Sequence, residues 1–270
     1  MTTETRVWGV VGIPGAGKST LCRKLVQEGE DGDFFHWERD NSEIMKHTKE
    51  GGEKWIMMQT GLMEARLGTI SAEMADAIRP NVEKVLRKIL PHLERYQSSP
   101  QYKTILDGIR GAMPIKSSFD FIMVIAKNWH LILAMEALQV FLRDTAGAVR
   151  GGVRAILCDN PNLYQRGVRG ELQKVLKMEG LGSGLLVMQT DNGILAQSIE
   201  QRMESGPGQE VYGMAVMGAA RDHDPVLAQE GWERLVVARR HTDIAKVSRR
   251  MLAKIDDGFL PSSVPLLRDH

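Results

Sequence analysis

A short glycine-rich segment between an apolar run and a helical pattern constrains this chain more than any other part of its sequence. Residues 6–11, Arg-Val-Trp-Gly-Val-Val, form a β-type run, and residues 19–26 have the pattern of a helix. Residues 12–19 between them read Gly-Ile-Pro-Gly-Ala-Gly-Lys-Ser, which satisfies G-x-x-x-x-G-K-[ST] in a strand–loop–helix context. The segment therefore predicts a P-loop, whose backbone N–H groups surround a phosphate at the start of a helix.

The motif assigns roles to individual residues and predicts two ligands, ATP or another NTP, and Mg²⁺. We expect Lys18 to reach the β- and γ-phosphates and the Ser19 hydroxyl to join the Mg²⁺ shell. The other residues predicted to bind the nucleotide are Gly12, Pro14, Gly15, Ala16, Gly17, Thr20 and Asn160.

Short apolar runs recur along the chain, with helical stretches between several of them. They lie at residues 34–37, 104–106, 153–158, 185–189 and 211–217. Strands that alternate with helices predict an α/β fold, with a mainly parallel, twisted sheet flanked by helices. We predict one domain over residues 1–257 and, after it, a docking or loosely ordered tail over residues 258–270.

The predicted domain contains a helical insertion at residues 41–100. Its apolar residues recur at three- and four-residue steps, and Pro80 and Pro91 are expected to break or kink its helices. Two further long helices are predicted, over residues 129–149 and 232–255.

Composition excludes several classes of protein. With 43% hydrophobic and 26% charged residues, the chain is neither disordered nor fibrous, and no apolar run approaches the ~20 residues of a membrane span. Two cysteines, Cys22 and Cys158, make no disulfide framework and indicate a reducing compartment, so we expect no secretion. Net charge is only +1, but residues 142–178 hold seven basic and three acidic side chains.

Two carboxylates follow predicted strands and are candidates for metal binding and catalysis. Asp107 follows the run 104–106 and precedes Gly108, so we predict that it holds the metal's water shell, with a turn residue as the alternative. Glu38 follows the run 34–37, at the same edge of a parallel sheet, and is the predicted catalytic carboxylate for NTP hydrolysis. Asp40 is the competing candidate for that role.

The second half of the chain supplies a predicted sensor, an RNA-binding segment and an arginine finger. Asn160 follows the run 153–158 and is the candidate γ-phosphate sensor; an Asn-Pro turn is the alternative. The basic side chains Arg166, Arg169 and Lys174 are predicted to contact the phosphates of a nucleic acid. A merely solvated charged surface is the alternative. Arg202 is the preferred arginine finger toward a neighbouring subunit, and Arg221 is the alternative.

Together these segments resemble the hexameric RNA-packaging NTPases of the cystoviruses, the double-stranded-RNA bacteriophages, which have a RecA-like core. The resemblance rests on the P-loop, on His36-Trp37-Glu38, on Leu106-Asp107-Gly108, and on the order of features from Leu142 onward. That order is Leu-Arg-Asp, a strand ending in Asn-Pro, a charged helix, and Gly-Leu-Leu-Val running to Asp-Asn-Gly and Arg202.

The resemblance implies a RecA-like, helicase-like hydrolase, a motor that moves single-stranded RNA into a viral capsid. It implies a homo-hexameric ring with nucleotides bound between subunits, contacts with capsid proteins, no membrane partner, and a location in the virion or the host cytoplasm. It gives residues 162–177 the role of gripping RNA, with Arg166 or Arg169 in place of the family's lysine. Members of that family carry a domain before the P-loop, whereas here the P-loop begins at residue 12.

Two other functions remain open from the sequence. A small-molecule or nucleoside monophosphate kinase shares this type of P-loop, and Arg110 in Asp-Gly-Ile-Arg would then clamp an acceptor phosphate. A non-catalytic P-loop assembly protein is the second alternative, and Glu38 argues against it.

Overall fold

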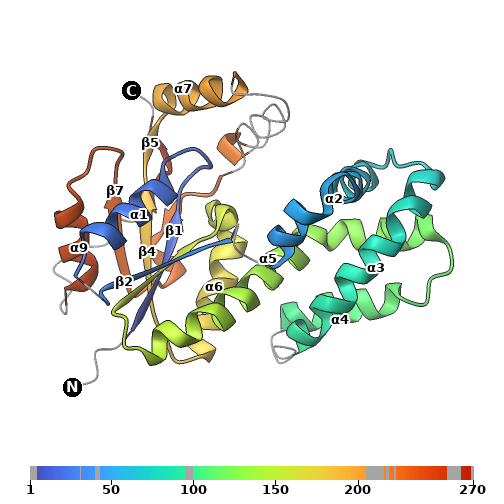
Figure 1. The fold of residues 1–270 in the computed structure, drawn as a ribbon, viewed down its shortest axis with the longest axis horizontal. Helices are drawn as coiled ribbons and strands as arrows, with labels where there is room; N and C mark the ends of the chain where they lie inside the picture. The colour runs from blue at the N-terminus through green and yellow to red at the C-terminus, as the bar shows by residue number, and fades with distance from the viewer. Residues whose placement is uncertain are drawn as a thin grey trace. The chain divides into compact units, whose positions relative to one another are not determined.

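The computed structural model describes residues 5–30, 32–39, 43–94, 100–204, 216, 219–221, 223–253 and 263–268. It divides the chain into two compact units. One unit contains residues 1–39 and 144–270 and is built around a sheet, and the other contains residues 40–143 and is helical (Figure 1). The predicted helical insertion therefore extends well beyond residue 100.

The sheet unit contains a five-stranded parallel sheet in the order β2-β3-β1-β4-β7. Its strands are β1 (Arg6–Val11), β2 (Phe34–Glu38), β3 (Ala155–Asp159), β4 (Gly182–Met188) and β7 (Arg234–Ala238). The fold is α/β, as the alternation of strands and helices predicts, and β1 lies at its centre. Because all five strands are parallel, their carboxyl ends meet at one edge, where Glu38 is in register with Asp159.

Alternating residues of the strands face the two helical layers of this unit. Trp8 and Val10 of β1 are buried against α1 (Lys18–Glu28) and α9 (Ile244–Leu252). Gly9 lies on the opposite side, where a Cβ would come 3.2 Å from Leu172 of α6 (Arg166–Met178). Successive side chains of a strand point to opposite faces of the sheet, so a strand covered by helices on both faces buries all of them.

Residue 184 of β4 must be glycine because its neighbour on β1 is a tryptophan. A Cβ at Gly184 would lie 2.7 Å from the Trp8 ring, closer than real side chains approach. Trp8 is fully buried, so its ring cannot move into solvent to make room. The Trp8 side chain of β1 therefore occupies the space that the absent side chain of Gly184 leaves on β4.

The described residues of the helical unit form four helices, and the last of these continues to residue 150, in the sheet unit. They are α2 (Glu43–Leu67), α3 (Ala72–Glu94), α4 (Pro100–Ala112) and α5 (Ser118–Arg150). Pro80 and Pro91 lie inside α3, so neither breaks the helix; the alternative expectation of a kink stays a prediction.

Two predictions of secondary structure are wrong. The run 104–106 is part of helix α4, where Ile105, Leu106 and Ile109 are buried at helical spacing. The predicted helix over 232–255 is strand β7 followed by α9, since burial alternates between Trp232, Arg234 and Val236 with the period of a strand. The run 211–217, apart from residue 216, lies outside the described residues.

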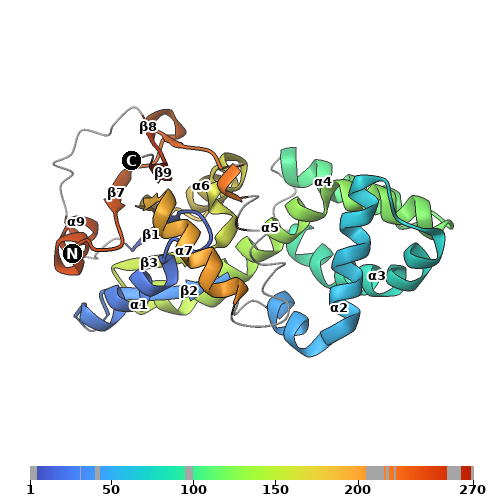
Figure 2. The ribbon, with the colours of Figure 1, turned by 90° about the horizontal axis from the view of Figure 1, so that it is seen from above.

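Shorter elements complete the sheet unit. They are the 3₁₀ turns η2 (Pro161–Tyr164) and η3 (Ala228–Glu230), the helix α7 (Asn192–Met203), and the two-residue strands β5 (Thr190–Asp191), β6 (Val226–Leu227), β8 (Ser263–Val264) and β9 (Leu267–Arg268). The described part of the C-terminal tail docks: β8 pairs with β6, β9 pairs with β5, and Leu266 is fully buried (Figure 2).

Candidate functional site

The glycine-rich segment forms the turn from β1 into α1, as its sequence predicts. Gly15 and Gly17 have φ angles of 91° and 90°, a left-handed conformation that favours glycine. Gly12 packs against the end of β4, where a Cβ would lie 2.9 Å from the Met188 carbonyl oxygen. The backbone thus turns tightly and begins α1 at Lys18, directly after the left-handed Gly17.

The side chain of Lys18 folds back over this loop. It is only 7% exposed, and its Nζ donates hydrogen bonds to the carbonyl oxygens of Gly12 at 3.0 Å and Ile13 at 3.2 Å. A buried ammonium beside a loop of backbone groups is a point charge suited to an anionic ligand.

The next residue, Ser19, is joined to a carboxylate on the strand adjacent to β1. The Ser19 hydroxyl donates to Asp159 Oδ2 at 2.6 Å, and Asp159 is the last residue of β3. Burial by itself would raise the pKa of the Asp159 carboxyl, but the neighbouring His36, Lys18 and Ser19 outweigh it and hold that pKa below its usual value. Asp159 is therefore a buried carboxylate that stays charged.

Asp107, the carboxylate predicted to hold the metal, is part of a helix and does not follow a strand. It is an exposed residue of α4 in the helical unit. The expectation that it follows a strand is wrong, and its metal role stays a prediction. A strand-end carboxylate beside β1 is supplied by Asp159, which also follows an apolar run; the sequence assigns a role only to the next residue, Asn160.

Glu38 ends β2 at the same edge of the sheet, as predicted. Its Oε1 accepts a hydrogen bond from Arg23 Nη2 at 3.2 Å and lies 3.7 Å from His36 Nε2. The Glu38 side chain is 24% exposed, which leaves it accessible from solvent. Asp40, its competitor, lies outside the described residues.

Asn160 follows Asp159 and is fully buried. Its Oδ1 accepts a hydrogen bond from the Asn162 N–H at 3.0 Å, which fixes the direction of the amide. Among the described residues, its Nδ2 has no hydrogen-bond partner. Asn160 thus caps the turn η2, as the Asn-Pro alternative predicts, and its role as a phosphate sensor stays a prediction.

A cavity of about 490 Å³ lies beside the glycine-rich loop, within the sheet unit. Thr20 and Lys24 of α1 line one part of it, and Arg239 and Arg240, at the end of β7, line another. Ligands of open α/β sheets bind outside the carboxyl ends of the strands, where this cavity lies. The sequence did not indicate these two arginines as site residues, because residues 232–255 were expected to form one helix.

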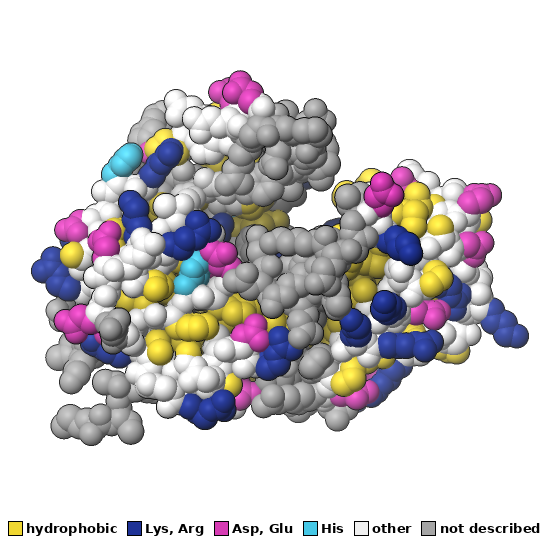
Figure 3. All heavy atoms as spheres, in the orientation of Figure 1, with side chains coloured by type: hydrophobic (Ala, Val, Ile, Leu, Met, Phe, Trp, Pro, Cys, Tyr) yellow, Lys and Arg dark blue, Asp and Glu magenta, His cyan; other side chains and the backbone are white. Residues whose placement is uncertain are grey.

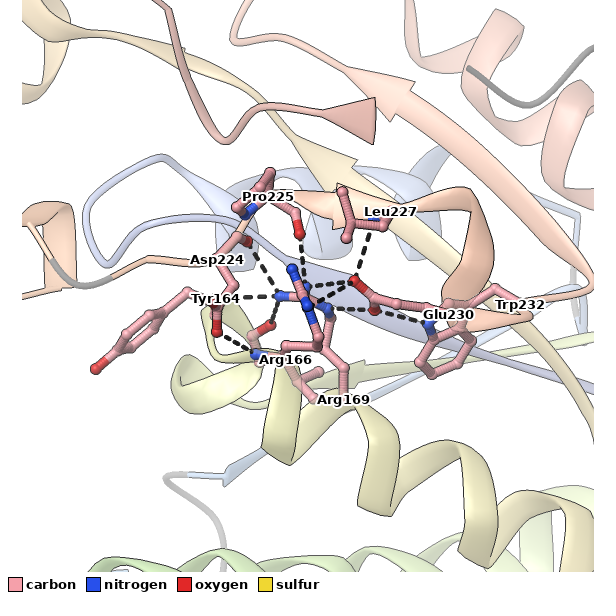
Figure 4. Close-up of polar contacts among 9 residues, drawn as sticks. Tyr164, Arg166, Arg169, Asp224, Pro225, Leu227, Glu230 and Trp232 are labelled. Carbon is pink, nitrogen blue, oxygen red and sulfur yellow. Dashed lines mark hydrogen bonds and ion pairs between the residues drawn. The ribbon is translucent and has the colours of Figure 1, made fainter. Parts of the chain in front are cut away.

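The residues predicted to grip RNA have other partners in the fold, as Figure 4 shows. Arg169 is fully buried and donates to both carboxylate oxygens of Glu230, at 2.8 and 2.7 Å. It also donates to the carbonyl oxygens of Leu163, Tyr164, Asp224 and Pro225. The prediction that Arg169 contacts RNA does not fit this burial, because its guanidinium has no surface left for a phosphate.

Arg166 and Lys174 are more exposed than Arg169. The backbone N–H of Arg166 donates to Asp224 Oδ2 at 2.7 Å, and its side chain is 47% exposed. Lys174 pairs with Glu171 at 2.7 Å. Figure 3 shows described basic and acidic side chains on the same face of the sheet unit.

Arg202 lies in α7, but its side chain lies outside the described residues, so the arginine finger stays a prediction. None of the described helices has both the length and the apolar character needed to cross a bilayer. The sequence matches no protein-family profile, and a search of curated proteins finds no match.

Proposed function

We propose that the sheet unit is an enzyme that binds an NTP with Mg²⁺ at the glycine-rich loop and transfers its γ-phosphate. The observation that carries the proposal is the 2.6 Å hydrogen bond between Ser19 and Asp159, next to the buried ammonium of Lys18. P-loop enzymes use this arrangement, in which a hydroxyl at the start of a helix lies beside an ionised carboxylate.

The donor set fits Mg²⁺. Ser19 and Asp159 offer hard oxygen ligands, which Mg²⁺ prefers, and the low pKa of Asp159 keeps its carboxylate ionised. Bound there, Mg²⁺ would neutralise charge on the phosphate oxygens. Lys18 would exchange its contacts with the loop carbonyl oxygens for contacts with phosphate.

We further propose that the phosphoryl acceptor is a second substrate bound by the same chain, which makes the protein a kinase. One observation favours this over the RNA-packaging motor. Arg169, central to the predicted grip on RNA, is buried and fully engaged.

In this proposal the described residues divide the remaining work. The cavity beside Thr20 and Lys24 would hold the base and ribose, with Arg239 and Arg240 near the phosphates. Glu38 would accept the proton of an acceptor hydroxyl, since it stands at the tip of β2 in register with Asp159. Arg110 has no part in this proposal, because it lies on α4 and pairs with Glu94 at 2.7 Å.

Paired substitutions test the assignment of the carboxylate. Asp159→Asn keeps the shape of the side chain but removes its charge, so NTP turnover should fall by about 10²-fold or more, as when one preorganised electrostatic group is lost. Asp107→Asn, on the exposed face of α4, is the matched control and should leave turnover within about twofold. Equal losses in both variants, or none in Asp159→Asn, would contradict the proposal.

The acceptor is tested by supplying NTP with either candidate substrates or single-stranded RNA. A kinase should consume NTP in proportion to an added hydroxyl compound or nucleoside monophosphate and should ignore RNA. RNA-stimulated hydrolysis with no phosphorylated product would restore the motor. Tight nucleotide binding with no turnover in any condition would favour the assembly protein.

A further inference from the structure

A thiol, an imidazole and a carboxylate lie close together in the sheet unit, and the carboxylate is the one proposed to hold magnesium. Cys22 Sγ, a ring nitrogen of His36 and a carboxylate oxygen of Asp159 all lie within 4.8 Å of one another. They come from α1, β2 and β3, so the packing of the sheet unit brings them together. The role proposed for Asp159 does not involve Cys22, and it involves His36 only as a neighbour that lowers the Asp159 pKa.

His36 is the member of this cluster that most needs an explanation. Its side chain is only 10% exposed, and no atom in the described part of the chain makes a hydrogen bond to Nε2. The nearest acceptors are Asp159 Oδ2 at 3.6 Å and Glu38 Oε1 at 3.7 Å, both beyond hydrogen-bond distance. A buried imidazole nitrogen without a partner, flanked by two carboxylates, is in the position of a metal ligand.

We propose that Cys22, His36 and Asp159 form a binding site for a thiophilic divalent cation of the zinc type. One sulfur, one nitrogen and one oxygen ligand suit zinc, whereas Mg²⁺ prefers oxygen alone. With metal–ligand bonds of about 2.0–2.3 Å, tetrahedral ligand atoms stand about 3.3–3.8 Å apart. The 3.6 Å between His36 and Asp159 already matches that spacing, and Cys22 needs to move by no more than about 1 Å.

Binding involves proton release but no redox step. Burial, and then the nearby Asp159 carboxylate, raise the pKa of the Cys22 thiol, so the free site holds the neutral thiol. The cation displaces the thiol proton to the buffer and forms a metal–sulfur bond in its place. The fourth coordination position of the cation would be open to water or to the Glu38 carboxylate. The Glu38 side chain is more exposed than that of His36.

Sharing of Asp159 couples this site to the proposed magnesium position. A cation held by Cys22 and His36 would draw the Asp159 carboxylate away from Ser19, and NTP turnover would be inhibited. This consequence rests on the proposed function, whereas the binding itself does not.

The test of binding uses Co²⁺ as a spectroscopic substitute for zinc, on the full chain without nucleotide. A thiolate bound to Co²⁺ gives a charge-transfer band in the near ultraviolet, and we expect this band to saturate at one equivalent and to disappear when Zn²⁺ is added. Cys22→Ala should abolish the band, and His36→Gln should weaken binding by at least about 10-fold. Cys158→Ala, which removes an equally buried thiol from β3, is the matched control and should keep the band.

Each result decides the proposal. A wild-type chain without a thiolate band, or a band that survives in Cys22→Ala, overturns it, as does a band lost only in Cys158→Ala. If Cys22→Ala does not fold by circular dichroism, Cys22→Ser replaces it, because the hydroxyl conserves the shape and also removes the thiolate band. Inhibition of turnover by buffered free Zn²⁺, relieved at least about 10-fold in Cys22→Ser, tests the coupling separately. A chain with no turnover but an intact Co²⁺ band would refute the proposed function and leave the metal site standing.

Discussion

At the scale of single residues, the candidate site depends on side chains that have little freedom to move. Ser19 and Lys18 begin a helix, and Asp159 is the buried last residue of a strand. The cost of holding these groups in place is met by the folding of the sheet, so it is not incurred again when a ligand binds. A site built this way tolerates few substitutions, even conservative ones.

Glu38 gives a prediction at this scale. Glu38→Gln removes the group that we propose accepts the acceptor's proton, so turnover should fall by about 10²–10⁴-fold while nucleotide affinity changes little. Steady-state rates and equilibrium binding of a nucleotide analogue measure the two effects. Glu28→Gln, at the exposed end of α1, is the control. A normal rate in Glu38→Gln would transfer the role to Asp40.

At the scale of elements, the network around Arg169 connects three segments that the sheet alone does not join. Arg169 of α6 bonds to the turn η2, to residues 224 and 225, and to Glu230 of η3. Glu230 also accepts from the Leu227 N–H and from Trp232 Nε1, which leads into β7. Burial would raise the pKa of Glu230, but Arg169 and these donors lower it overall, so the pair stays ionic.

Arg169→Ala tests whether this network holds the fold together. The substitution leaves Glu230 buried without its charge partner and should lower the free energy of unfolding by about 3–5 kcal/mol. Urea denaturation measures the loss. Arg166→Ala, half exposed on the same helix, should change stability by no more than about 0.5 kcal/mol. Similar small effects in both variants would show that Arg169 is not structural.

At the scale of the whole molecule, the assembly state separates the two enzymatic functions. A chain that binds nucleotide in its own cavity needs no neighbour, so we expect one or two copies per particle in the presence of Mg²⁺ and NTP. Size-exclusion chromatography with light scattering gives this mass directly. A particle about six times the chain mass would support the ring implied by the resemblance to packaging motors.

Much of the sheet unit follows from local sequence. The boundaries of β1 and the positions of β2, β3 and most of β4 could be predicted from apolar runs, and the loop from its three glycines and its lysine. These signals are local: backbone conformation at Gly15 and Gly17 and burial on both faces of a parallel strand act over a few residues.

Errors arose where a short apolar run fits two periodicities. Residues 104–106 and 234–238 each hold too few side chains to separate a helix from a strand, and packing against the rest of each unit decided between them. The same limit hid Asp159: the sequence contains two apolar runs that end in Asp, and only the sheet order shows which one adjoins β1.

The sequence by itself determined the α/β class, the glycine-rich turn with Lys18 and Ser19, and Glu38 at a strand end, because each depends on neighbours in the chain. Only the tertiary structure decided that Asp159 partners Ser19, that Arg169 is buried, and that Cys22 and His36 meet Asp159. Two of these three facts join residues more than a hundred positions apart in the sequence, and the third depends on burial. Pairing of distant strands and burial in a core are properties of the folded chain as a whole.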